Sequence, residues 1–352
     1  MELNNYILFF FLFLFTLFFY KYFPSIIYKF NSNILIDNEY KKPQAFHEYS
    51  ISTSGGLGIF FSFLIVFFYF LFFKQIIYFE YLSFCTLFFL LGLLDDLKLN
   101  IRPKFRLILM IVFLASLVIL NKFYVENTGI AFLNRFLEID IFALFFICLC
   151  FLFIINGSNL IDGYNGLLGI HAIIILTILF FINYLNNNYD LAFFILSGIL
   201  ILLIFLRYNF PKASIFLGDS GSYFLGTFIA ISVIKTSIAN PFISPFFFCI
   251  LLFYLFFEVF FSFIRKIVKE RRSPLFPDGK HLHMLVYKAL LKKNKNKLKS
   301  NYLVSAVINS IYLILITPSI FMMHDGIFCK YYSILFFVIY LFAYKKISNK
   351  IS

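Results

Sequence analysis

Charged residues are scarce in this sequence: Asp, Glu, Lys and Arg make up 13% of its 352 residues, whereas 62% are hydrophobic and tryptophan is absent. This composition excludes an ordinary soluble domain and is typical of a membrane protein. Apolar stretches of about 20 residues, the length that a helix needs to cross the hydrocarbon core, recur along the whole chain. They leave no room for a separate soluble domain, so we expect residues 1–352 to form a single integral membrane domain.

Motifs that would indicate a zinc protein, a secreted precursor or an inverted-repeat transporter are also missing. None of the five cysteines belongs to a metal-binding pair, since Cys148 and Cys150 would point to different faces of a helix. The first apolar run is too long for a cleaved signal peptide and lacks a small-residue cleavage site, so we expect it to be a transmembrane helix. No inverted repeat is evident.

Eleven transmembrane helices account for the apolar stretches, and the loops between them alternate between two sides. One set of loops comprises 28–50, 95–104, 159–163, 209–221, 265–300 and the C-terminal tail. All but five of the 30 Lys and Arg residues lie in this set or at the helix ends beside it; the exceptions are Lys74, Lys122, Arg135, Lys235 and Lys330. The positive-inside rule therefore places this set in the cytoplasm, the N-terminus outside and the C-terminus inside.

The predicted fold is an all-α polytopic membrane protein. The net charge of +13 then reflects cytoplasmic loops and anionic lipid, not nucleic acid. The predicted spans are approximately 6–27, 51–73, 77–94, 105–121, 141–158, 164–183, 191–208, 222–239, 245–264, 301–323 and 331–344.

Five polar strings interrupt the apolar sequence, each where a helix meets a loop. All five fall on the predicted cytoplasmic side, which favours a shared site over scattered structural turns. The strings are "STSGGLG" (52–58), "LLDDLKLNIRPKFR" (93–106), "NGSNLIDGYNGL" (156–167), "FLGDSGSYFLG" (216–226) and "SPLFPDGKHLHM" (273–284).

Asp95 and Asp96 are adjacent acids at the end of an apolar helix. The two carboxylates repel each other and a helix C-terminus repels both, so the arrangement is costly unless a cation lies nearby. A solvated helix end paired with Lys98 or Arg102 is the structural alternative. Asp219 lies in a Gly-Asp-Ser-Gly-Ser turn, where glycines would let a ligand approach backbone N–H groups, although a plain helix-capping turn is equally consistent.

The string at 156–167 places Asn156, Asn159 and Asp162 three residues apart, so that they share a helix face or line one loop. Amides and an acid together suit a hard cation or the edge of a nucleobase, and hydrogen bonding between helices is the alternative. Further along, "HLHM" places His281 and His283 beside Arg271 and Arg272. This combination suits phosphate binding, with a solvated loop as the alternative.

Together, the hard oxygen ligands Asp95, Asp96 and Asp219 indicate Mg²⁺, or Mn²⁺ in its place. The basic residues around them indicate a diphosphate ligand, and their location in a membrane protein indicates that one substrate is a lipid. These features predict phosphoryl transfer involving a lipid phosphate at the cytoplasmic surface. A transporter would instead need polar residues near the membrane midplane and on both membrane faces. In this sequence only Glu258 lies deep within a predicted span. For Glu258 we expect a structural hydrogen bond within the bundle.

The order of the strings resembles the polyprenyl-phosphate N-acetylhexosamine-1-phosphate transferase family. "STSGG" is similar to its Pro-x-x-Gly-Gly string with Ser52 at the proline position, and "DDLK" is similar to its Asp-Asp pair. "NGSNLIDGYNGL" is similar to Asn-x-x-Asn-x-x-Asp-Gly-x-Asp-Gly-Leu with Asn165 at the second Asp position, and "GDSGS" matches outright. "PDGKHLHM" is similar to the His-x-His-His loop with Met284 at the last position.

The resemblance implies transfer of a HexNAc-1-phosphate from a UDP-HexNAc to undecaprenyl phosphate at the cytoplasmic face of the bacterial inner membrane, with release of UMP. The "HLHM" string is closer to enzymes that start O-antigen-like surface glycans than to the peptidoglycan translocase, which carries three consecutive histidines. Dimers occur in the family, so a homodimer is expected by analogy.

Site residues also follow from the resemblance. Asp219, Asn159 and Asp96 are expected around Mg²⁺, and Asp95, Asp96 and Asp219 are expected to be catalytic. Asn165 is expected to read the uracil edge, with Asn156 and Asp162 beside it. His281 and His283, with Arg271 or Arg272, are expected to hold the diphosphate or sugar. Independently of the resemblance, Arg102 and Lys104, with Arg106, lie just past the acids at the membrane surface and are expected to hold the lipid phosphate, for which positive-inside anchoring is the alternative.

Overall fold

A computed structural model of the protein describes residues 3–29, 34–38, 50–99, 101–125, 127–271, 273 and 278–351. These residues are almost entirely helical. The helices are α1 (Leu3–Lys29), α2 (Gly55–Phe73), α3 (Phe79–Asp96), α4 (Pro103–Asn121), α5 (Ala131–Leu137), α6 (Asp140–Ile161), α7 (Leu167–Leu185), α8 (Tyr189–Asn209), α9 (Gly218–Ala239), α10 (Pro245–Leu251), α11 (Phe253–Ile264), α12 (Leu282–Asn294), α13 (Lys297–Phe321) and α14 (Gly326–Ile351). A π-helical turn, η1 (Arg265–Lys269), extends α11.

Each of the eleven predicted spans coincides with a long helix or, for 245–264, with the pair α10 and α11. By length and apolarity, nine of the described helices could cross a membrane, and ten if that pair, which is bent by 73°, counts as one span. Helix α3 is not among them because three of its 18 residues are acidic, and all three lie near its ends. The all-α polytopic fold is thus confirmed, whereas the count of eleven stays a prediction.

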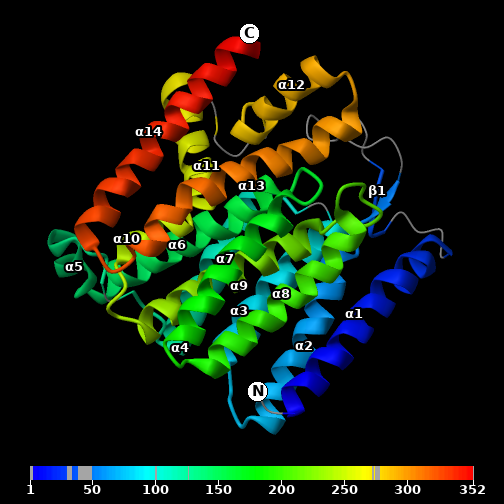
Figure 1. The fold of residues 1–352 in the computed structure, drawn as a ribbon, viewed down its shortest axis with the longest axis horizontal. Helices are drawn as coiled ribbons and strands as arrows, with labels where there is room; N and C mark the ends of the chain where they lie inside the picture. Colours follow the sequence, from blue (N-terminus) through cyan, green and yellow to red (C-terminus); the bar gives the residue numbers. More distant parts are fainter. Residues whose placement is uncertain are drawn as a thin grey trace.

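Helix α9 lies at the centre of the bundle and packs against α3, α6, α2 and α7 (Figure 1). It is the most buried and among the least apolar of the long helices, since protein surrounds it where lipid surrounds the outer ones. Tyr81, Phe84 and Phe88 of α3 are fully buried, and Tyr81 donates a hydrogen bond to Ser232 of α9. Helices α3 and α9 therefore form the core pair on which the site is built.

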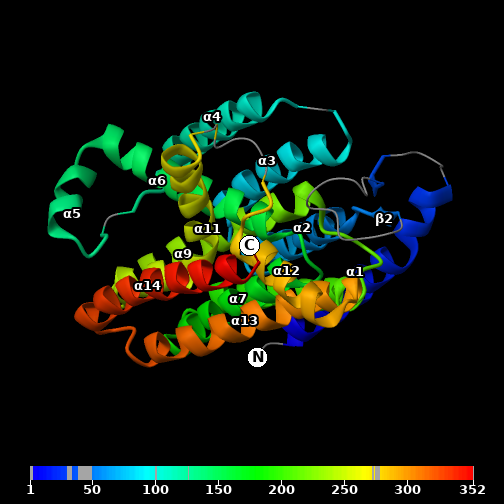
Figure 2. The same ribbon diagram turned by 90° about the horizontal axis from the view of Figure 1, so that it is seen from above.

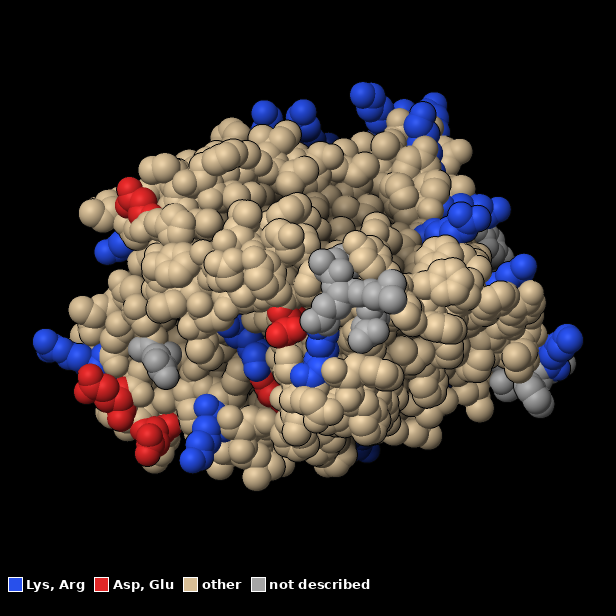
Figure 3. Space-filling model, turned by 60° about the horizontal axis from the view of Figure 1, so that its bottom comes forward, with Lys and Arg blue, Asp and Glu red and all other residues tan. Residues whose placement is uncertain are grey.

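The outer helices show the apolar exposure that a lipid-facing surface requires. In α1 and α14, large side chains such as Phe10 and Phe342 are about two-thirds exposed. Figure 3 views the side that is lowest in Figure 1 and shows a largely uncharged surface, with acidic and basic side chains at its edges and a few in a central hollow. Figure 1 also shows the two chain ends at opposite ends of the bundle.

A small sheet and two short helices lie outside the long helices, mostly in segments that the sequence predicted as loops, although β2 falls at the start of the predicted span 51–73. A two-stranded antiparallel sheet pairs β1 (Ile36–Asp37) with β2 (Ile51–Ser52), and Ser52 forms a parallel bridge with Ile215. Helix α5 stands apart from the bundle and has no buried residue, as Figure 2 shows. Helix α12 packs against α13 and α14. The strands and α5 are too short for periodicity to reveal them.

Candidate active site

The N-terminus of α9 carries Asp219 and is held by the last residue of α3. Both carboxylate oxygens of Asp96 accept backbone N–H groups: Oδ1 accepts that of Asp219 and Oδ2 that of Ser220, each at 2.9 Å. A carboxylate at a helix N-terminus satisfies free N–H groups and complements the helix dipole. The sequence left a plain helix-capping turn as the alternative, but these N–H groups are accepted by Asp96, 123 positions earlier than Asp219.

Glycines bring the polar strings into backbone contact. A Cβ at Gly56 would lie 2.4 Å from the backbone nitrogen of Gly221, and one at Gly92 would lie 2.4 Å from the carbonyl oxygen of Asp219. The N–H of Gly56 also donates to the carbonyl of Leu217. Gly56 and Gly92 therefore allow the close approach of α2 and α3 to α9, whereas the expected approach of a ligand to the glycines of the Gly-Asp-Ser-Gly-Ser turn stays a prediction.

Asp95 and Asp219 face the same cation, the guanidinium of Arg106. Nη1 of Arg106, in the first turn of α4, hydrogen-bonds Oδ2 of Asp95 and lies 3.7 Å from Oδ2 of Asp219. The guanidinium also lies over the ring of Tyr223, 5.8 Å from its centroid. The sequence paired the acids with Lys98 or Arg102, but Arg106 makes the contact. The side chain of Asp219 is 38% exposed, so the cluster is open to a ligand.

Asn159 completes this cluster from the end of α6. Its amide donates to Oδ1 of Asp219 at 2.7 Å and to the hydroxyl of Ser222 at 3.0 Å. Asn156, one turn earlier, donates instead to the carbonyl of Leu152 in its own helix. Of the residues at spacing three, Asn159 thus contacts Asp219 directly, whereas the Asn156 amide bonds within its helix. We call Asp95, Asp96, Arg106, Asn159 and Asp219 the carboxylate cluster.

The loop that follows α6 links this cluster to the histidines. Burial, together with the negative charges of Asp219 and Asp96, raises the pKa of Asp162 well above its ordinary value. The Tyr164 ring lies 5.7 Å from that of His283. Asn165 is buried and its amide donates to the carbonyl of Pro211 at 2.9 Å. In this structure the Asn165 side chain thus joins two loops, and its expected role toward uracil stays a prediction.

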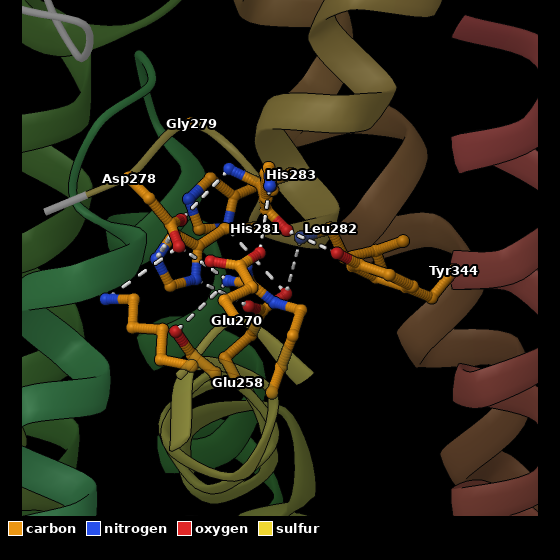
Figure 4. A network of polar contacts seen from close by, with 12 residues as sticks. Glu258, Glu270, Asp278, Gly279, His281, Leu282, His283 and Tyr344 are labelled. Atoms are coloured by element: carbon orange, nitrogen blue, oxygen red, sulfur yellow. Dashed lines mark hydrogen bonds and ion pairs between the residues drawn. The ribbon is translucent and has the colours of Figure 1, made fainter. Parts of the chain in front are cut away.

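His281 and His283 are buried rather than solvated, and their rings stack 5.5 Å apart. Glu258 of α11 binds the start of α12 from below: Oε2 lies 3.2 Å from Nδ1 of His281, and Oε1 accepts the N–H of Leu282 at 3.1 Å (Figure 4). Nδ1 of His283 lies 3.4 Å from the hydroxyl of Tyr254. The expected structural role of Glu258 agrees with these bonds.

Asp278 supplies a second carboxylate on the side of His281 that faces away from Glu258. It accepts hydrogen bonds from Arg265 at 2.8 Å and from the N–H of Lys280 at 3.0 Å, and lies 3.5 Å from Nε2 of His281. Burial alone would raise the pKa of Asp278, but these hydrogen bonds outweigh it and hold the pKa below its ordinary value. Burial lowers the pKa of His283 to about 4. We call Glu258, Arg265, Asp278, His281 and His283 the histidine cluster.

The remaining basic candidates lie outside both clusters. Arg102 is the residue before α4 and is exposed, as is Lys104 in its first turn. Arg271 is exposed and has a positive φ of 50°. Arg272 lies outside the described residues. Exposed basic side chains at this end of the bundle are available to an anionic ligand, whereas His281 and His283 are enclosed by protein.

The donor set of the carboxylate cluster fits Mg²⁺. Among the residues that the structure describes, no group of three or more His, Cys, Asp or Glu side chains is arranged to hold a metal ion. Mg²⁺ commonly binds through one or two carboxylates and takes its other ligands from water and substrate phosphates. Asp95 and Asp219 supply two carboxylates that already share one cation, so the residues present suit a hard divalent ion completed by substrate.

Several residues that contribute to the site were not predicted from the sequence. Asn209 accepts the N–H of Gly166 at 2.7 Å, and Asn301 accepts that of Asn165 at 2.8 Å. Asp278 was part of a quoted string but was given no role. The signal that could have found them is polarity itself, because amides and acids next to apolar runs are seldom without a partner.

Comparison with known proteins agrees with these features. The model of glycosyl transferase family 4 matches residues 78–237, which contain the Asp-Asp pair and the Gly-Asp-Ser-Gly-Ser turn. An undecaprenyl-phosphate alpha-N-acetylglucosaminyl 1-phosphate transferase of Thermotoga maritima is 31% identical over 55% of this chain and 57% of its own length. A phospho-N-acetylmuramoyl-pentapeptide-transferase of Dictyoglomus turgidum is 36% identical over 48% of this chain and 55% of its own.

A second phospho-N-acetylmuramoyl-pentapeptide-transferase, of Clostridium botulinum, is 32% identical over 40% of this chain and 46% of its own length. The chain thus spans about half the length of the curated relatives it matches. The family match and the identity to these relatives agree with the ordered motifs and with the cluster that those motifs build. Residues 78–237 thus resemble glycosyl transferase family 4, and the chain is similar to these relatives over about half its length.

Proposed function

We propose that this protein transfers a HexNAc-1-phosphate from a UDP-HexNAc to undecaprenyl phosphate, releasing UMP. The observation that carries the proposal is the meeting of Asp95 and Asp219 around one cationic group, with Asn159 beside them. These residues come from α3, α9 and α6, and their carboxylates share Arg106 of α4. Carboxylates clustered around a cation beside exposed basic residues suit a reaction between two phosphates.

The reaction needs little covalent chemistry from the protein. An oxygen of the acceptor phosphate attacks the β-phosphorus of the UDP-sugar, a new P–O bond forms, and the bond to the bridging oxygen breaks as UMP leaves. The acceptor phosphate has its second pKa near 6, so it is mostly a dianion near pH 7. Mg²⁺, when bound, would neutralise charge on the diphosphate. Asp95 is positioned to orient the acceptor or take its last proton.

The exposed basic residues at the start of α4 suit the acceptor. Arg102 and Lys104 extend from the same helix end that carries Arg106, close to where an apolar helix begins. A lipid phosphate held there would lie at the membrane surface with its chain along apolar helices. This arrangement favours a multi-pass enzyme of the inner membrane with its site on the cytoplasmic face, where the positive-inside rule places these loops.

A phospho-MurNAc-pentapeptide transfer is the second candidate, favoured by the names of two of the relatives described above. The "HLHM" string favours the first, because Leu282 separates His281 from His283 where the resembled translocase carries three consecutive histidines. We place the enzyme at the first membrane step of surface-glycan assembly on this ground. A lipid-linked sugar transporter is the non-enzymatic alternative.

Purified protein tests the proposal when it is given a panel of UDP-sugars with undecaprenyl phosphate and Mg²⁺. The panel contains UDP-GlcNAc, UDP-QuiNAc, UDP-FucNAc and UDP-MurNAc-pentapeptide. We expect UMP release with an N-acetylhexosamine donor and a lipid product whose mass equals acceptor plus HexNAc-1-phosphate. Turnover of UDP-MurNAc-pentapeptide alone would select the second candidate, and an absence of UMP release from every donor would contradict both enzymatic assignments.

A further inference from the structure

The guanidinium of Arg106 occupies the place between Asp95 and Asp219 that a divalent cation bound by both carboxylates would take. Its guanidinium contacts Asp95 and lies 3.7 Å from Asp219, and these are the two carboxylates best placed to bind a metal ion. The side chains of Arg106, Asp95 and Asp219 are 26%, 13% and 38% exposed, so the contact is partly shielded from solvent. The positive charge of Arg106 thus compensates the two acids.

A metal ion and this guanidinium compete for the same oxygens. A divalent cation bound by Asp95 and Asp219 would lie within a few ångströms of Nη1, where two positive charges repel strongly and partial burial limits screening. The backbone of Arg106 is fixed in the first turn of α4, but its long side chain has freedom to turn. Its ring contact with Tyr223 is long, at 5.8 Å, and does not lock it in place.

The acceptor phosphate of the proposed reaction would offer the displaced guanidinium an anionic partner. A guanidinium binds phosphate through two parallel N–H donors and is more weakly hydrated than an ammonium. Arg102 and Lys104, exposed at the same helix end, already make this region basic. Arg106 released from the carboxylates is therefore available to the phosphate of the acceptor.

We propose that Arg106 exchanges between two positions, one on Asp95 and Asp219 and one on the acceptor phosphate, and thereby couples metal binding to acceptor binding. The proposal rests on the proposed function for the identity of the acceptor. Its metal half concerns this chain's own residues and is measured without turnover. The coupling is reciprocal: the metal frees Arg106 for the acceptor, and an acceptor that holds Arg106 favours the metal.

Binding of Mn²⁺ to the purified full-length protein, followed by EPR without substrates, tests the metal half. We expect Arg106→Gln to bind Mn²⁺ more tightly than the wild type, by about five- to a hundredfold, the usual range of coupling between two ligands. Arg207→Gln is the matched control, because Arg207 is an exposed arginine in the last turn of α8 and the charge change is the same. Its Mn²⁺ affinity should equal that of the wild type.

An unchanged or weaker Mn²⁺ affinity in Arg106→Gln would overturn the proposal, and so would an equal gain in Arg207→Gln. If Arg106→Gln does not fold, Arg106→Lys replaces it. The ammonium is a strongly hydrated point charge that yields the carboxylates more readily, so a smaller gain is expected, and no gain would overturn the proposal.

The acceptor half uses farnesyl phosphate as the probe. In the wild type, adding it should tighten Mn²⁺ binding, and in Arg106→Gln this effect should disappear while the KM for undecaprenyl phosphate rises. A farnesyl phosphate effect of equal size in both proteins would overturn the coupling. Failure of the proposed function is seen separately, because the wild type would then release no UMP although the Mn²⁺ measurements keep their outcome.

Discussion

The carboxylate of Asp96 receives the backbone N–H of Asp219 at 2.9 Å, so the last residue of α3 sets the position of the first carboxylate of α9. The second N–H of α9, that of Ser220, goes to the other oxygen of the same carboxylate. The two adjacent acids therefore act differently: Asp95 faces the cation and Asp96 holds the helix that carries Asp219. Repulsion between the acids is relieved because each has its own positive partner, a guanidinium or a helix N-terminus.

Asp96→Asn should lose both stability and activity. Asparagine keeps one oxygen acceptor but turns an NH₂ group toward the second backbone N–H, and hydrogen bonds to a charged group contribute about 1.5–3 kcal/mol each. A shift of Asp219 of about 1 Å would cost on the order of a hundredfold in rate. The measurement is the apparent melting temperature in detergent together with UMP release. Wild-type values of both in Asp96→Asn would contradict the anchoring role of Asp96.

Gly56→Ala should destabilise the protein, because its methyl group would press on the backbone of Gly221. Backbone cannot move aside as a side chain can, so the cost is about 1–3 kcal/mol or more. Gly163→Ala is the control, since a Cβ at that position would have nothing within 4 Å. Thermal melting of both variants checks the prediction. Equal melting temperatures would mean that the contact between α2 and α9 is not as tight as the structure indicates.

Much of the site's location was predictable from the sequence, but its internal contacts were not. The alternation of basic loops put all five polar strings at one end of the bundle, and the structure brings Asp95, Asp96, Asn159 and Asp219 together there. The partner of each acid, in contrast, could not be predicted from the sequence. The bond between Asp96 and Asp219 joins residues 123 positions apart, and no local spacing encodes it.

For His281 and His283, the sequence pointed to the residues but did not predict their surroundings. The two histidines and two arginines predicted phosphate binding, with a solvated loop as the alternative. His281 and His283 are buried against Glu258, which contradicts the solvated loop and leaves phosphate binding a prediction. The acid that pairs with them, Glu258, lies in the middle of an apolar helix, 23 residues before His281. Tertiary packing decides such pairs, because buried ions are stable only where a partner is brought to them.

Acid should destabilise the folded protein through His283. An unfolded chain protonates histidine near pH 6.5, whereas burial lowers the pKa of His283 to about 4. Between these values the unfolded chain binds more protons, so stability falls as the pH falls, by up to about 3 kcal/mol. His283→Gln should flatten the fall in melting temperature between pH 6.5 and 4.5. The same slope in the variant and the wild type would show that His283 does not contribute it.

Glu258→Gln should loosen the start of α12. The glutamine would keep an oxygen for the N–H of Leu282 but lose the charged contact with His281. Hydrogen exchange measured by mass spectrometry should therefore rise in residues 278–285. Glu138→Gln is the matched control, since Glu138 is exposed at the end of α5 and the charge change is the same. Unaltered exchange in Glu258→Gln would remove Glu258 from the positioning of this segment.

The rate of UMP release by Asp219→Asn, measured against Mg²⁺ concentration with an N-acetylhexosamine donor and undecaprenyl phosphate, tests the carboxylate cluster most directly. The wild type should need Mg²⁺, and the variant should be slower on the order of a thousandfold while its yield in membranes is unchanged, because removing one charged ligand disables the site and leaves the fold intact. A variant that releases UMP at the wild-type rate and with the same Mg²⁺ dependence would contradict a phosphoryl-transfer site built around Asp219.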